Sequence, residues 1–160
     1  MRLTLTALAG LTFAGLAAPA FAQDIEAGAK TFNQCQTCHV VQNEAGETLA
    51  GKNAKTGPNL YGVVGRVAGS LEGFKYGAGI EELKATGYVW TEADLAVYVQ
   101  DPTKFLVEKT GDKKAKSKMM FKLKKEEDAK NVVAFLASLA PAADAAATDA
   151  AAPAEGAVTE

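Results

Sequence analysis

The sequence has few of the residues that bind metals or form disulfides. Its 160 residues include two cysteines, one histidine and one tryptophan. Two cysteines allow one disulfide at most. A structural zinc site needs four ligands, and the cysteines and the histidine supply only three. Such a site would therefore need carboxylates to complete it.

The sequence also has no large excess of positive or negative charge. The formal net charge is −2, and it becomes −3 without Arg2, which is too even a balance for a general nucleic-acid binder. The distribution is uneven, because residues 104–130 contain ten lysines against five acids. This segment is either a basic docking surface or simply a solvated face.

A long apolar run is missing as well. Residues 1–22 begin with Arg2, continue with an apolar stretch interrupted by threonines, and end on Ala-Phe-Ala. This pattern is typical of a secretory signal peptide that is cleaved before Gln23. The alternative is a membrane anchor, but the stretch falls short of the ~20 residues that a spanning helix needs. We therefore expect export to the periplasm.

The other end has a composition of its own. Residues 140–160 are mostly alanine, with four acids, no base, and no Leu, Ile or aromatic residue. They cannot bury enough apolar surface to offset their ordering entropy, so a disordered acidic tail is expected. A fluctuating helix is the alternative, because alanine favours helix. Residues 23–139 then form one domain of ordinary size.

The two cysteines and the histidine stand together as Cys35-Gln-Thr-Cys38-His39. A disulfide or a redox pair of thiols is one interpretation, but such pairs usually follow a strand, and residues 24–33 look helical. The C-x-x-C-H spacing is also the signature of covalent haem attachment. Two thiols then bond the porphyrin vinyl groups, and the imidazole becomes an axial ligand. We predict one haem c bound in this way.

Periodicity predicts an all-α fold with three main helices. Asp24 can cap a helix over about residues 25–34. A second helix begins at the capping box Thr91–Asp94 and stops at Asp101-Pro102. The last helix covers about residues 125–139 and carries apolar residues at i, i+3, i+4 and i+7. These are Ala129, Val132, Val133 and Leu136.

No convincing strand is predicted. Residues 41–79 contain nine glycines and little periodicity. A loop of this length is unusual in a compact domain. It is reasonable if the loop wraps a large apolar cofactor, so we expect long loops around the haem.

The iron needs a second axial ligand or an open position. Methionine suits electron transfer, whereas an open position suits gas binding or peroxide chemistry. Apart from Met1, only Met119 and Met120 remain, in Lys118-Met119-Met120-Phe121. One of them can ligate while the other packs, although methionine more often fills a core.

These motifs together resemble the class I c-type cytochromes, most closely the bacterial cytochrome c2 and c-550 branch. The resemblance covers nearly all of residues 24–139 and implies the monohaem cytochrome c fold. A lysine-rich insertion at residues 111–117 and the alanine-rich tail depart from the common pattern. The motifs that carry the resemblance are Cys35–His39, Lys55–Leu60, Gly73–Tyr76, Trp90 and Lys118–Phe121.

The resemblance implies roles for particular residues around the haem. Cys35 and Cys38 would form the thioether bonds, and His39 and Met119 would be the axial ligands of the iron. The carbonyl of Pro58 would accept a hydrogen bond from the axial imidazole.

It implies further contacts in the haem pocket. Arg66, Tyr76 and Trp90 match residues that neutralise or hydrogen-bond the haem propionates. The hydroxyl of Tyr98 would point toward the ligating sulfur, and Ser117 would keep a hydroxyl for a propionate. Gly28 and Phe32 match the face of the first helix that crosses the last helix near Val132 and Phe135.

The function implied is that of a soluble periplasmic one-electron carrier rather than an enzyme. Its expected partners are a quinol–cytochrome c oxidoreductase and a cytochrome c oxidase, with a photosynthetic reaction centre or periplasmic dehydrogenases as further options. A haem enzyme or ligand sensor is the rival, but the chain has no spare histidine for it. Lysines around the haem edge would steer docking. The candidates are Lys30, Lys52, Lys55, Lys104, Lys118, Lys122 and Lys124.

Overall fold

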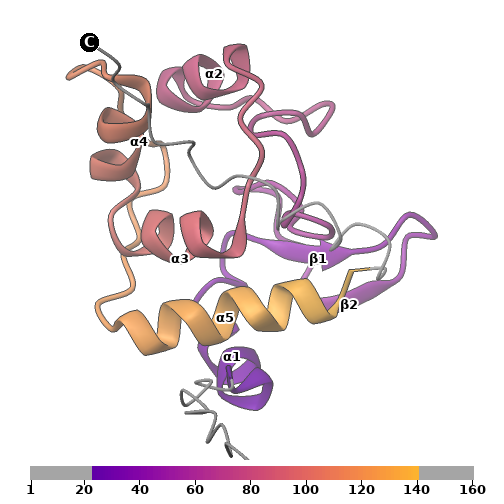
Figure 1. Cartoon of the computed structure of the whole chain (residues 1–160). Coiled ribbons are helices and arrows are strands. Elements are labelled where there is room, and N and C mark those ends of the chain that lie inside the picture. Colours follow the sequence, from indigo (N-terminus) through magenta and orange to yellow (C-terminus); the bar gives the residue numbers. More distant parts are fainter. Residues whose placement is uncertain (1–22, 141–160) are drawn as a thin grey trace, which may run out of the picture.

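The computed structural model describes residues 23–140. The predicted signal peptide and nearly all of the predicted tail lie outside these residues. Five helices and one small antiparallel hairpin make up the described part (Figure 1). They are α1 (Ile25–Phe32), β1 (Val40–Gln42), β2 (Thr48–Gly51), α2 (Ala78–Ala85), α3 (Glu92–Gln100), α4 (Pro102–Thr110) and α5 (Glu126–Ser138).

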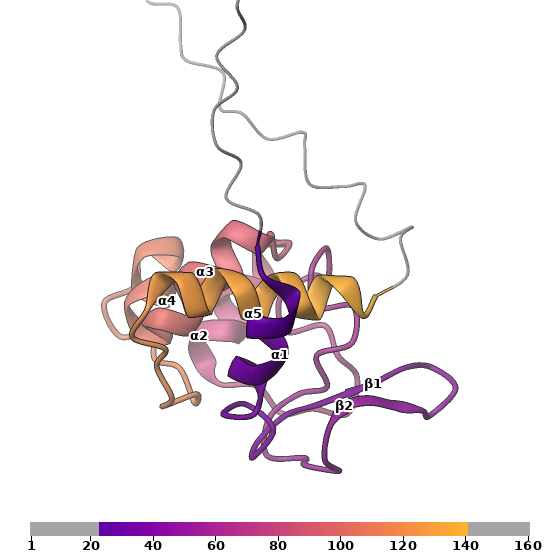
Figure 2. The same ribbon diagram turned by 90° about the horizontal axis from the view of Figure 1, so that it is seen from below.

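The first and last helices cross each other, as Figure 2 shows. Asp24 caps α1 by accepting a hydrogen bond from the Ala27 amide at 2.9 Å. Gly28 faces α5 so closely that an added Cβ would lie 2.0 Å from the carbonyl oxygen of Asn131. Phe32 and Phe135 pack with ring centroids 5.7 Å apart. The predicted crossing is confirmed, with Asn131 as an unforeseen part of it.

The helix α5 carries the largest share of the core. Its apolar stripe is buried as the periodicity predicts, and it packs on both α1 and α3. Asn131 is the polar exception: it is buried, and its side-chain oxygen accepts a hydrogen bond from the Asp24 amide at 3.0 Å. A buried amide of this kind needs a partner, and the chain's own N-terminal segment provides one.

Two helices were not predicted. Asp101-Pro102 does end α3, but it also starts α4, because proline suits the first turn of a helix and Asp101 accepts a hydrogen bond from the Lys104 amide. The helix α2 was missed because its N-cap, Gly77, has no side chain with which to cap the helix. The fold class holds, while the expected number of helices was too low.

The expectation of no strand was also wrong. β1 pairs with β2, and the register places Val40 opposite Gly51 and Val41 opposite Ala50. The turn is closed by the side chain of Asn43, which accepts from the Glu47 amide at 2.9 Å. Apart from these strands and the start of α2 at Ala78, residues 41–79 form loops, as expected.

Candidate haem-binding site

The Cys-X-X-Cys-His segment forms a helical turn directly after α1. The amides of Cys38 and His39 both donate to the carbonyl of Cys35 at 3.0 Å. This turn brings the two thiols and the imidazole into one short stretch of backbone. Both cysteines are free, so the disulfide alternative is not formed. Within residues 23–140, moreover, no group of three His, Cys, Asp or Glu side chains could hold a metal ion.

The two thiols have different surroundings. Cys35 is half-buried against the core, and Cys38 is exposed. Burial, with a smaller effect of the neighbouring Cys38, raises the pKa of Cys35 to about 11. Cys35 is therefore a protonated thiol at neutral pH, and the thiolate form that binds metals is disfavoured.

The imidazole of His39 is held by the next loop. Its Nδ1 lies 2.9 Å from the carbonyl oxygen of Pro58, so Nδ1 carries the proton and Nε2 is left as the electron-pair donor. Burial lowers the pKa of His39, while the Pro58 hydrogen bond acts in the opposite direction. The amide of Gly57 donates to the Cys38 carbonyl at 2.7 Å and fixes this loop.

Gly57 lies flat against the His39 ring. A Cβ at this position would lie 2.4 Å from the ring Cε1 and 2.8 Å from Nε2. Glycine is therefore required for close approach rather than for a special backbone angle. The sequence motif included Gly57, but nothing in the sequence alone indicated its contact with the imidazole.

The methionine loop is anchored to the corner between α3 and α4. The Ser117 amide donates to Thr103 Oγ1 at 3.3 Å, and the Met119 amide donates to Ser117 Oγ at 3.0 Å. The Tyr98 hydroxyl lies 3.0 Å from the same Ser117 oxygen. The structure thus brings the predicted residues Tyr98 and Ser117 together. The sequence did not indicate that Thr103 belongs to this network.

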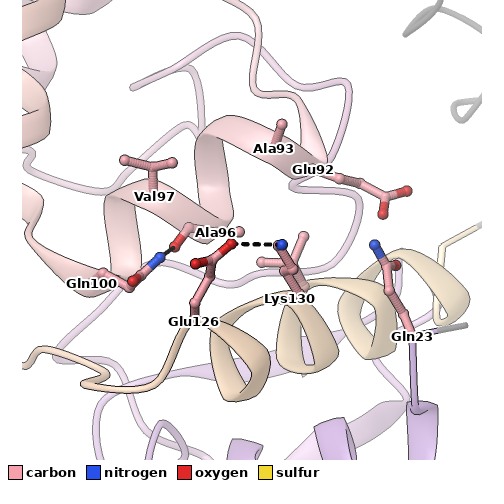
Figure 3. A pocket seen from close by; sticks show the side chains of 9 residues that line it. Gln23, Glu92, Ala93, Ala96, Val97, Gln100, Glu126 and Lys130 are labelled. Carbon is pink, nitrogen blue, oxygen red and sulfur yellow. Dashed lines mark hydrogen bonds and ion pairs between the residues drawn. The ribbon is translucent and has the colours of Figure 1, made fainter. Parts of the chain in front are cut away.

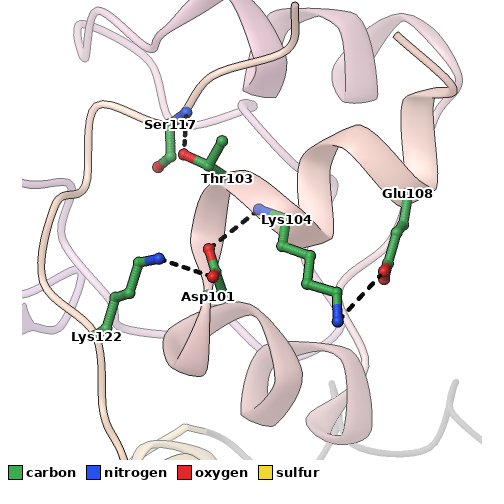
Figure 4. Close-up of polar contacts among 6 residues, drawn as sticks. All are labelled: Asp101, Thr103, Lys104, Glu108, Ser117 and Lys122. Carbon is green, nitrogen blue, oxygen red and sulfur yellow. Dashed lines mark hydrogen bonds and ion pairs between the residues drawn. The ribbon is translucent and has the colours of Figure 1, made fainter. Parts of the chain in front are cut away.

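Charged groups tie the loop at both sides. Lys122 Nζ contacts Asp101 Oδ2 at 2.7 Å, next to the Thr103–Ser117 contact (Figure 4). Lys118 Nζ donates to the carbonyl of Lys75 at 3.0 Å, 43 residues away in the chain. The loop around Met119 is therefore held on both sides, by Lys118 and by Lys122. We call residues 118–122 the strap.

Arg66 is half-buried and holds the preceding loop together. Its Nη1 and Nη2 donate to the carbonyls of Tyr61 and Asn59, each at 3.0 Å. Burial lowers the pKa of Arg66, and the nearby Tyr76 acts in the opposite direction. Two backbone bonds do not use all five guanidinium donors, so Arg66 can also serve a carboxylate such as a propionate.

Trp90 is 5% exposed and lies at the centre of an aromatic cluster. Its ring centroid lies 5.0 Å from that of Tyr98, 5.5 Å from that of Phe105 and 5.7 Å from that of Tyr88. The Trp90 amide donates to the Arg66 carbonyl at 3.0 Å. The cluster therefore links three of the predicted pocket residues into one rigid unit.

A separate cleft of about 650 Å³ lies between α3 and α5 (Figure 3). It contains the Glu126–Lys130 ion pair, at 2.6 Å, and shares no residue with the predicted site. Its lining consists of Gln23, Glu92, Ala93, Ala96, Val97, Gln100, Glu126, Lys130 and Val133.

The residues present fit a covalently bound haem. Two free thiols in one helical turn, an imidazole whose Nε2 is unprotonated, and a thioether on an anchored loop are the donors that such a group requires. Together with the helical fold, they define a class I c-type cytochrome.

Comparison with individual proteins supports this class, although family models do not contribute. No protein-family model matches the sequence. Cytochrome c2 of Cereibacter sphaeroides is 59% identical over 142 residues, which cover 88% of this chain and 98% of that protein. Cytochrome c-550 of Paracoccus versutus is 55% identical over 153 residues, covering 93% and 95%.

Solved structures lead to the same family. The crystal structure of cytochrome c2 from Rhodobacter sphaeroides has a TM-score of 0.70 and 64% identity, and it covers 72% of this chain and 94% of that one. Ferric cytochrome c-550 from Paracoccus versutus has a TM-score of 0.68 and 55% identity, covering 74% and 98%. The chain belongs to the cytochrome c2 and c-550 family, whose members carry electrons on one covalently attached haem c and are not enzymes.

Proposed function

We propose that the haem is bonded to Cys35 and Cys38 and that His39 and Met119 are its axial ligands. When bound, the haem supplies the one-electron couple. The observation that carries the proposal is the 2.9 Å contact between His39 Nδ1 and the Pro58 carbonyl, which orients Nε2 as the donor to a metal. The anchored loop then presents the sulfur of Met119.

The pocket residues act on this pair of ligands indirectly. Tyr98 and Ser117 form a hydroxyl network that holds the Met119 amide. Arg66 and Trp90, joined through their backbones, would offer hydrogen-bond donors to the propionates, with Tyr76 beside Arg66. Fixed ligands leave little to rearrange when the electron moves.

A matched pair of variants tests the ligand assignment. Methionine-bound ferric haem has a weak near-red absorption band. Met119→Leu should lose this band, whereas Met120→Leu should keep it. Loss of the band in Met120→Leu alone would move the ligand to Met120 and refute the assignment. A haem that acid–acetone extracts would refute attachment through the cysteines.

We place the carrier in the periplasm, in agreement with the predicted signal peptide and with the lack of any membrane-spanning helix within residues 23–140. Its proposed partners are a quinol–cytochrome c oxidoreductase, a cytochrome c oxidase, and a reaction centre or periplasmic dehydrogenase. Docking through lysines is supported by the exposure of Lys30, Lys52, Lys55, Lys118 and Lys124.

Two of the seven candidate lysines contribute less to docking. Lys104 lies 3.8 Å from Glu108, and Lys122 lies 2.7 Å from Asp101. Electrostatic steering accelerates association about 10- to 1,000-fold and weakens with salt. Lys55→Glu should slow association with an acidic partner, while Lys84→Glu, the same charge change on α2, should not. Association rates that do not change with salt would refute this docking surface.

A further inference from the structure

The two neighbouring methionines have opposite surroundings. Met119 is half-buried, and its amide is fixed by Ser117 Oγ at 3.0 Å. Met120 is 84% exposed. It is the most exposed large apolar side chain of residues 23–140, ahead of Val97 at 51%. Burying a methionine stabilises a fold, and Met120, which is almost fully exposed, gains little of this stabilisation. Packing in the core therefore does not explain why a methionine stands at position 120.

An exposed thioether has a chemistry of its own. Two-electron oxidants such as hypohalous acids and peroxides convert it to the sulfoxide. With hypochlorous acid, the oxygen is transferred to sulfur, which loses two electrons, and chloride and a proton are released. The sulfoxide is polar, so the same change at a buried methionine disrupts its contacts.

We propose that Met120 is an oxidation site that intercepts such oxidants ahead of Met119. The proposal rests on the proposed function in one respect, since the sulfur that Met120 spares is the axial ligand. Both sulfurs lie on the same strap, so an oxidant that approaches from solvent meets Met120 first. Met120 can become a sulfoxide without loss of a core contact.

The order of oxidation follows from access. Met120 reacts from the folded state, whereas the half-buried Met119 is less accessible until the strap opens locally. The strap is held on either side of Met119 by the Lys118–Lys75 and Lys122–Asp101 contacts. We expect Met120 to be oxidised at least about tenfold faster than Met119, which corresponds to an opening free energy of about 1.4 kcal/mol.

The test treats the haem-bearing protein with one equivalent of hypochlorous acid and maps the sulfoxides by peptide mass spectrometry. In the unmodified sequence, oxygen should be found on Met120, and the near-red band should persist. In Met120→Leu, the same dose should oxidise Met119 and reduce the band. Val97→Leu is the control, because it alters an exposed apolar side chain without removing a thioether, and it should behave like the unmodified sequence. Equal oxidation of both methionines would overturn the proposal. So would a Met120→Leu protein that needs the same dose of hypochlorous acid as the unmodified protein to lose the near-red band.

The outcome can be separated from that of the proposed function. The peptide map reports the order of oxidation whether or not Met119 binds iron. If Met119→Leu keeps the near-red band, the ligand assignment fails, while preferential oxidation of Met120 still supports its role as the intercepting site. If Met119→Leu loses the band but the unmodified chain is oxidised equally at both positions, the ligand is right and the interception is wrong.

Discussion

Gly57→Ala gives the most direct test of how the imidazole is held. The new Cβ would lie 2.4 Å from His39 Cε1, 2.6 Å from Nδ1 and 2.8 Å from Nε2, whereas ordinary contact begins at 3.4 Å. The ring or the loop must therefore move by about 1 Å. Such a shift distorts the 2.9 Å contact with the Pro58 carbonyl and weakens that hydrogen bond.

The cost has two parts. Overpacking a tight site costs about 1–3 kcal/mol. The weakened hydrogen bond adds up to about 1.5 kcal/mol. We therefore expect the free energy of unfolding to fall by about 1–4.5 kcal/mol. At a slope of about 4 kcal/mol per molar guanidinium chloride, the unfolding midpoint falls by about 0.3–1.1 M.

The assay is equilibrium unfolding of the haem-bearing protein, followed by the fluorescence of Trp90. The control is Thr56→Ala, an exposed neighbour on the same loop that should change stability by no more than about 0.5 kcal/mol. A Gly57→Ala protein whose midpoint matches that of the control would show that the ring and loop yield freely. The contact between Gly57 and His39 would then not hold the imidazole in place.

Three further predictions concern the scaffold. Gly28→Ala places a Cβ 2.0 Å from the Asn131 carbonyl oxygen and should lower the unfolding free energy by about 1–3 kcal/mol; an unchanged thermal midpoint would contradict the close crossing. Asn131→Ala leaves the Asp24 amide without its partner and should cost about 1–3 kcal/mol, measured by urea unfolding, whereas a neutral effect would mean that water replaces the side chain. The hydrogen bond from Lys122 lowers the pKa of Asp101, so its contribution is present above the unfolded pKa and is lost as the pH falls through the folded value. Asp101→Asn should therefore flatten the acid limb of stability below about pH 4, and an identical pH profile would refute the role of the pair.

Much of the molecule could be predicted because the relevant signals are local. The stripe Ala129, Val132, Val133 and Leu136 is buried in α5, and Thr91 accepts from the Asp94 amide as the capping box requires. The Cys-X-X-Cys-His spacing needed no tertiary information.

The features that could not be predicted depend on distant partners or on weak local signals. Asp101-Pro102 both ends the helix α3 and begins the helix α4, and periodicity alone could not show that a second helix follows. The guanidinium of Arg66 bonds two backbone carbonyls, which no side-chain pattern indicates. Thr103 acts only because the chain returns to it fourteen residues later at Ser117.

The crossing of α1 and α5 has a consequence for the order in which the domain forms. The contact between the Asp24 amide and the Asn131 side chain spans 107 residues, so nearly the whole domain is one closed loop. Forming a contact of this sequence separation costs loop-closure entropy, which slows folding. A chain that emerges with its N-terminus first cannot complete the crossing until α5 has followed. Cys35 and Cys38 precede α5 in the chain, so they would be available for cofactor attachment before the crossing is complete.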